Sequence, residues 1–150
     1  TDTVAKTSGT TNLHIKNPSD NERSLHVHGL NIATQFPGFY TVYDTFTAGP
    51  TGGTPLTPQA LLADSQATPT TSIMEANKNV THSGEDYHST EVFAAGGKNS
   101  KSGGAAKAEN PIVEPGRELV IEVTNTSVDA NDASILLTFC ECPEVYSDFL

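Results

Sequence analysis

Short runs in which apolar and polar residues alternate are the feature that most limits the fold of this chain. "TNLHIKN" places Leu13 and Ile15 at alternate positions, and "SLHVHGLNIA" does the same with Leu25 and Val27. A third run, "ELVIEV", follows a Pro-Gly turn in the C-terminal third. A period of two is that of a β-strand, whose successive side chains point to opposite faces of a sheet. These runs therefore predict strands with one apolar face each.

The segments between the runs favour an all-β fold. The chain has 12 Gly, 9 Pro and no Trp, and turn residues separate its short apolar runs without a strand–helix–strand rhythm. Many short strands with frequent turn signals are typical of sandwiches. We expect an antiparallel β-sandwich, jelly-roll-like, formed by a single domain over residues 11–150. Residues 1–10, which are small and polar, are predicted to form an extended N-terminal arm.

One short helix is expected within a long loop of this sandwich. Thr57 is suited to the N-cap and Pro58 to the first helical position, with apolar residues at 60–62. The Gly- and Lys-rich stretch at 96–108 predicts a second long loop that is flexible.

The strand pairings that the runs suggest bear directly on the histidines. We expect residues 11–17 to form a hairpin with 24–30, which would place His14 opposite or diagonal to His26 or His28. The runs "ELVIEVTN" and "SILLTFCEC" are expected to form a second hairpin. Gly29 offers a β-bulge that would re-aim the strand after it.

Three imidazoles on one face would suit zinc or copper, and "HVHG" resembles a copper-binding stretch of multicopper oxidases. The other residues of such sites are missing, because Met74 is the only methionine and no histidine lies near the two cysteines in sequence. A mixed zinc site from His26, His28, Cys140 and Cys142 is an alternative, although one intervening residue is fewer than paired zinc ligands usually have. The simpler interpretation, that the histidines alternate along strands without an ion, is our prediction.

Other chemistry is not indicated. The chain has no phosphate-binding loop and no Gly-x-Ser-x-Gly elbow, and its carboxylates fall at outward strand positions or in loops. We therefore expect no enzymatic activity, no catalytic residue and no cofactor. Cys140 and Cys142 are interpreted as free thiols of a protein made in a reducing cell.

The charge limits the partners. Eighteen acidic residues against eight basic ones give a formal charge of −10, which disfavours nucleic acid and anionic membranes. No run of ~18 apolar residues is present, and the N-terminal stretch lacks the apolar core of a signal peptide, so neither membrane insertion nor export is indicated.

Two stretches resemble a known family. "NPIVEPGRELVIEVTNTSVDANDASILLTF" (110–139) is similar to the closing segment of small β-sandwich capsid decoration, or cement, proteins of tailed viruses such as bacteriophages. "TNLHIKNPSDNERSLHVHGL" is similar to their first hairpin. The resemblance implies a structural virion protein that assembles in the host cytoplasm. It would bind the major capsid protein on the outer capsid surface, commonly as a homotrimer, and stabilise the shell.

Aromatic residues around the "FPGFY" turn are the candidates for such contacts. Phe36, Phe39, Tyr40 and Tyr43 could lie in an interface, where aromatic residues are enriched, or could simply fill the sandwich. Two other functions stay open on the sequence: a carbohydrate- or receptor-binding jelly roll, and a small cupin-like or cupredoxin-like metal protein.

Overall fold

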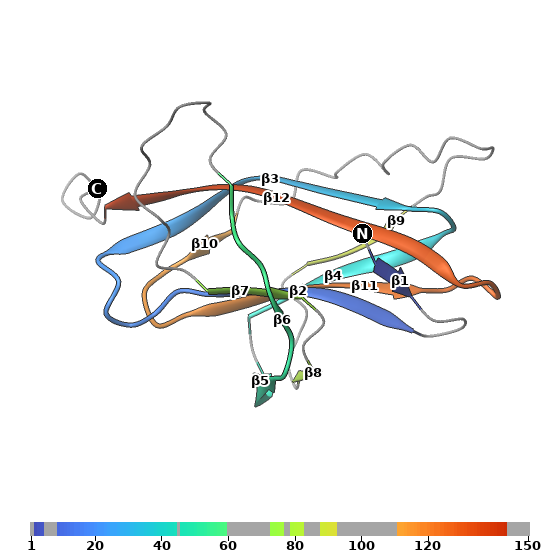
Figure 1. Cartoon of the computed structure of the whole chain (residues 1–150), viewed down its shortest axis with the longest axis horizontal. Coiled ribbons are helices and arrows are strands. Elements are labelled where there is room, and N and C mark those ends of the chain that lie inside the picture. Colours follow the sequence, from blue (N-terminus) through green and yellow to red (C-terminus); the bar gives the residue numbers. More distant parts are fainter. Residues whose placement is uncertain are drawn as a thin grey trace.

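Two antiparallel sheets pack face to face in the computed structural model of the chain (Figure 1). The four-stranded sheet contains, in spatial order, β1 (Asp2–Val4), β12 (Asn131–Pro143), β3 (Arg23–Thr34) and β10 (Ile112–Val113). The six-stranded sheet contains β6 (Thr54–Pro55), β7 (Ile73–Ala76), β2 (Thr10–Lys16), β11 (Glu118–Asn125), β4 (Gly38–Tyr43) and β9 (His88–Val92). A separate two-stranded sheet pairs β5 (Phe46–Thr51) with β8 (Asn79–His82). The predicted antiparallel β-sandwich is confirmed.

The structure describes residues 2–4, 9–44, 46–59, 73–76, 79–82, 88–92 and 111–143. Side chains are described for 9–44, 51–59, 73–76 and 111–142. Within these residues there is no helix. Positions 60–62 of the predicted helix and the predicted loop at 96–108 lie outside them.

The core lies between the two larger sheets and is formed by the apolar positions that alternate in the sequence. Each facing strand contributes every second residue, as expected for side chains that leave a strand on opposite sides. The predicted inward positions of these strands are buried, so the alternation is confirmed. The buried core residues are Leu13, Ile15, Leu25, Val27, Ile32, Tyr40, Val42, Met74, Val113, Leu119, Ile121, Val123 and Ala133.

Both predicted hairpins are wrong, because β2 and β3 lie in different sheets, and so do β11 and β12. β2 pairs with β11 and β7, whereas β3 pairs with β12 and β10. β11 likewise pairs with β2 and β4 rather than with β12. Crossing between the sheets at these two turns places apolar faces opposite one another across the core, as in Greek-key and jelly-roll sandwiches.

Asn17 fixes the first of these crossings, between β2 and β3. Its side chain is fully buried, and Nδ2 donates hydrogen bonds of 2.8 Å to the carbonyl oxygens of Arg23 and Val113. Its Oδ1 accepts a hydrogen bond of 2.7 Å from Asn21 Nδ2. One amide therefore joins the end of β2 to β3 and β10, two strands of the opposite sheet.

Two further asparagines fix the opposite end of the sandwich, where β11 turns into β12. Asn125 Nδ2 donates to the Asp129 carbonyl at 2.8 Å, and Asn125 Oδ1 accepts from the Ser127 backbone at 2.9 Å. Asn131 exchanges two hydrogen bonds with the backbone of Phe36. Both asparagines are buried, so each end of the sandwich is closed by internal amides.

Part of the segment predicted as an N-terminal arm pairs with the sandwich. β1 lies antiparallel to β12, with Asp2 opposite Ala133 and Val4 opposite Asn131. The Gly9 carbonyl accepts a hydrogen bond of 2.9 Å from the Asn125 backbone. Residues 2–4 thus form an edge strand of the four-stranded sheet.

The bulge predicted at Gly29 is confirmed. Gly29 pairs with Thr138 and Val27 pairs with Phe139, which leaves His28 as an extra residue in β3. Buried positions consequently change from odd numbers before the bulge to even numbers after it, as at Ile32. This irregularity lets β3 keep its apolar side on the core along its whole length.

Candidate functional site

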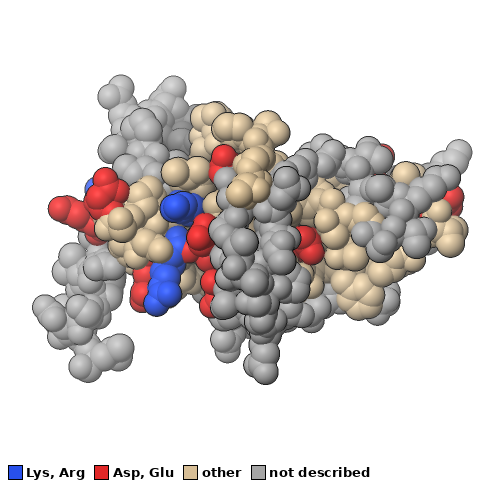
Figure 2. All heavy atoms as spheres, turned by 90° about the horizontal axis from the view of Figure 1, so that it is seen from below, with Lys and Arg blue, Asp and Glu red and all other residues tan. Residues whose placement is uncertain are grey.

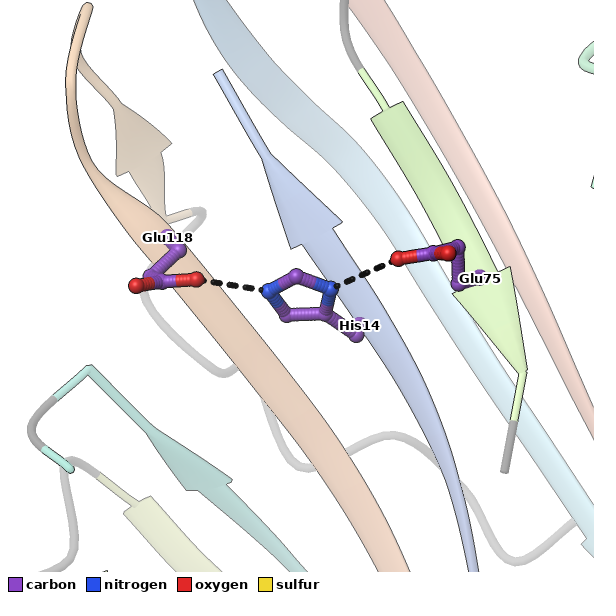
Figure 3. A network of polar contacts seen from close by, with 3 residues as sticks. All are labelled: His14, Glu75 and Glu118. Atoms are coloured by element: carbon purple, nitrogen blue, oxygen red, sulfur yellow. Dashed lines mark hydrogen bonds and ion pairs between the residues drawn. The ribbon is translucent and has the colours of Figure 1, made fainter. Parts of the chain in front are cut away.

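A buried histidine lies between two carboxylates on the outer side of the six-stranded sheet (Figure 3). His14 of β2 is 2% exposed, and its Nε2 is hydrogen-bonded to Glu118 Oε2 of β11 at 2.8 Å. On the other side of the ring, Nδ1 lies 3.6 Å from Glu75 Oε2 of β7. The three side chains come from adjacent strands because Val120 and Glu75 are the direct partners of His14 in the sheet.

This arrangement connects polar side chains of three adjacent strands. His14 Nδ1 has no hydrogen-bond partner within the described residues, and the Glu75 carboxylate lies beside it at 3.6 Å. The neighbouring Val120 is fully buried and presents no reactive group. No group of three or more His, Cys, Asp or Glu residues in the described ranges is arranged to hold a metal ion. We interpret the contact as one that joins β7, β2 and β11.

His26 and His28 lie on the other side of the molecule. They belong to β3 in the four-stranded sheet, where Leu25 and Val27 face the core, so His26 points to the outer face. The expected shared face of His14 with His26 and His28 is therefore wrong. The two sheets separate these imidazoles, and a metal site made from all three is not formed.

A different neighbour approaches His28. Its Nε2 lies 3.0 Å from Cys140 Sγ of β12, and Cys140 Sγ lies 2.6 Å from Cys142 Sγ. Both cysteines are free and half-buried. The hydrogen bond with Cys142, together with partial burial and the Cys142 charge, raises the pKa of Cys140 to about 11. Spacing in the sequence could not reveal this cluster, because it depends on the register of β12 against the bulged β3.

The aromatic candidates fall into different environments. Tyr40 is a core residue, and Tyr43 is 6% exposed and donates a hydrogen bond of 3.3 Å to Glu122 Oε1. Phe36 is half-buried at the β3–β4 turn, whereas Phe39 is 41% exposed. Among the four, Phe39 presents the most surface for a contact.

The outward surfaces of the two larger sheets differ in charge. The six-stranded sheet carries Lys16, Glu75, Glu118 and Glu122 at outward positions, and Figure 2, which views this side, shows red and blue side chains next to one another. On the four-stranded sheet we define the β3–β12 face by outward residues of β10, β3 and β12 beyond the end that pairs with β1. They are Ile112 of β10, His26, His28, Asn31 and Ala33 of β3, and Ser134, Leu136, Thr138, Cys140 and Cys142 of β12. Asp132 of β12, which also points outward and is exposed, pairs with β1 and bounds this face.

The residues that define this face include no Asp, Glu, Lys or Arg, although the chain has 26 such residues, the sum of 18 acidic and 8 basic ones. It also exposes large apolar side chains. Leu136 is 65% exposed and Ile112 is 56% exposed. Low charge combined with exposed apolar side chains is typical of surfaces that contact other proteins.

Comparisons with protein-family models, with curated proteins and with solved structures found no match. The part of the chain that the structure describes contains no helix long and apolar enough to cross a membrane.

Proposed function

We propose that the chain is a structural protein, without enzymatic activity, that binds another polypeptide through the β3–β12 face. The observation that carries this proposal is that the residues defining this face, which Asp132 bounds at one end, include no charged side chain, while Leu136 and Ile112 are largely exposed. Removing these side chains from water would stabilise a complex by ~25 cal/mol per Å² of apolar surface. Binding at this face would remove none of its defining residues' side chains from water at the cost of desolvating a charge.

The more specific form of the proposal is a capsid decoration protein of a tailed virus. It is supported by the resemblance of residues 110–139 to that family and by the net charge of −10, which favours a position away from packaged DNA. The partner would be the major capsid protein, and the protein would bind as a homotrimer on the outer capsid surface. A protein that binds only the assembled shell stabilises it by mass action, and many copies multiply the effect.

Co-sedimentation with expanded capsid shells tests the proposal. We expect the protein to sediment as a trimer, to pellet with shells and to raise the temperature at which they break. Leu136→Glu should weaken binding about tenfold or more, because a charge would be buried at the centre of the contact. The matched control is Val128→Glu, in the β11–β12 turn, where the side chain is 80% exposed and lies away from the face.

A monomer that does not pellet with shells and leaves their disruption temperature unchanged would contradict the decoration role. Equal binding by the Leu136→Glu variant and the unchanged protein would instead contradict the assignment of the β3–β12 face. The first result therefore tests the identity of the partner, and the second tests the surface that binds it.

A further inference from the structure

We propose that Cys142, Cys140 and His28 form a reversible dithiol site that reacts with small-molecule disulfides. The site closes to a disulfide within β12 and opens again when a thiol reduces it. Its chemistry is independent of the proposed binding to a capsid, because it requires only the free protein and a disulfide such as oxidised glutathione.

The first support is that the two sulfurs already face each other. Cys140 and Cys142 leave β12 on the same side, and their Sγ atoms are 2.6 Å apart, close to the ~2.05 Å of a disulfide. Both are half-buried rather than enclosed in the core, which leaves a path for a small reactant. Two residues two apart in one strand are therefore able to close a bond here.

The contacts assign different roles to the two cysteines. Cys140 holds its proton more strongly, since its pKa is raised to about 11 chiefly by the hydrogen bond with Cys142. The reactive species is the thiolate, so Cys142 makes the first attack and Cys140 makes the second. Cys140 needs a base for its step, and His28 Nε2 lies 3.0 Å from its sulfur.

The reaction balances in two steps. The Cys142 thiolate attacks one sulfur of the external disulfide, forms a mixed disulfide and releases one thiolate, which takes a proton from water. Cys140 then gives its proton to His28 Nε2 and attacks the Cys142 sulfur, which releases the second thiolate; that thiolate receives the proton from His28. Two protein thiols are oxidised to one disulfide, and one external disulfide is reduced to two thiols.

The geometry of the strand also makes the closed form easy to reopen. Two residues two apart on a strand have Cα atoms ~6.6 Å apart, near the upper limit of ~6.8 Å for disulfides. A bond at this limit is strained and is reduced more readily than a relaxed structural disulfide. The site should therefore follow the ratio of oxidised to reduced thiol around it.

Intact mass spectrometry of the purified full chain tests the site. The reduced protein is incubated with mixtures of oxidised and reduced glutathione, quenched with N-ethylmaleimide and weighed. We expect the unchanged protein to lose two hydrogens without retaining glutathione, and dithiothreitol to restore them. Cys140→Ser should stop at a glutathione adduct on Cys142, and in the unchanged protein the first adduct should also lie on Cys142.

The role of His28 has its own variant and control. His28→Gln should slow closure of the mixed disulfide about tenfold or more, without slowing the first step. His26→Gln is the matched control, because His26 lies on the same face but makes no hydrogen bond to either described sulfur. Each variant is checked for an unchanged melting temperature.

Three results would overturn the proposal. The unchanged protein could accumulate stable glutathione adducts or linked dimers in place of the internal disulfide, which would exclude the dithiol site. A first glutathione adduct on Cys140 rather than on Cys142 in the unchanged protein, located by peptide mass spectrometry, would exclude the order of attack. Equal slowing by His28→Gln and His26→Gln would remove His28 as the base.

Discussion

Asn131 and Phe36 exchange two hydrogen bonds, although 95 residues separate them in the chain. The Phe36 backbone N–H donates to Asn131 Oδ1 at 2.8 Å, and Asn131 Nδ2 donates to the Phe36 carbonyl at 2.8 Å. This reciprocal pair connects the start of β12 to the β3–β4 turn. It adds to the backbone contact beside it, in which the Gln35 N–H donates to the Asp132 carbonyl at 2.9 Å.

Replacing Asn131 with Ala should lower the free energy of unfolding by about 2–4 kcal/mol. The substitution leaves the N–H and carbonyl of Phe36 without their partner at a buried position, and each unsatisfied group costs about 1–3 kcal/mol. Urea unfolding measures the change. Asn31→Ala, at an exposed position of β3, is the control and should change stability by less than about 0.5 kcal/mol.

The two carboxylates beside His14 should contribute unequally to stability. Glu118→Gln weakens a hydrogen bond of 2.8 Å to a buried ring and should cost about 1–2 kcal/mol, reduced by the 29% exposure of the Glu118 side chain. Glu75→Gln alters a contact of 3.6 Å and should cost less than about 1 kcal/mol. Thermal unfolding of both variants tests the order, which would be refuted by a larger loss for Glu75→Gln.

Gly38 of β4 should tolerate substitution less well than Gly29 of β3. A Cβ at position 38 would lie 2.6 Å from the Thr124 carbonyl oxygen, so β4 and β11 would have to separate. We expect Gly38→Ala to cost about 1–3 kcal/mol. A Cβ at Gly29 would lie no closer than 3.7 Å to Thr138, so Gly29→Ala should change the midpoint of urea unfolding very little.

The raised pKa of Cys140 predicts a pH dependence in the alkaline range. The hydrogen bond with Cys142, with burial and charge, raises it from 9.0 to about 11 in the folded chain. The folded state therefore binds the proton more tightly than the unfolded state. The corresponding stability is fully present below pH 9 and is lost as the pH rises through about 11.

The free energy of unfolding of the unchanged protein and of Cys140→Ser is measured at several pH values. Subtracting one from the other isolates the effect, because the contributions of the other titrating groups cancel. The difference in the free energy of unfolding should decrease as the pH rises from 9 to about 11. Alkylation by iodoacetamide gives a second readout, in which Cys142→Ser should let Cys140 react at lower pH. An unchanged pH profile of Cys140 in that variant would disprove the coupling.

The buried face of each strand could be predicted from the sequence, but its neighbours in the sheet could not. Leu13, Ile15, Leu25 and Val27 are buried as their spacing predicts. Alternation predicts which side of a strand is apolar. It is equally consistent with the next strand pairing beside it in the same sheet or packing across the core in the other sheet. The short loop at 17–22 permits both, and the buried amide of Asn17 accompanies the crossing.

The polar clusters were less predictable than the core. His14 lies on the polar side of its strand, yet it is buried, because Glu75 and Glu118 come from strands far away in the sequence. The proximity of His28 to Cys140 arises in the same way from pairing across 112 residues. The reactive geometry of a side chain depends on register, which local periodicity does not contain.

The extra residue at His28 has a consequence for how this chain can change. One added residue between Val27 and Gly29 is all that keeps both halves of β3 facing inward. Loss of one codon there would leave composition and hydropathy almost untouched but would turn half of the strand inside out. β3 should therefore tolerate single substitutions better than the insertion or deletion of one residue.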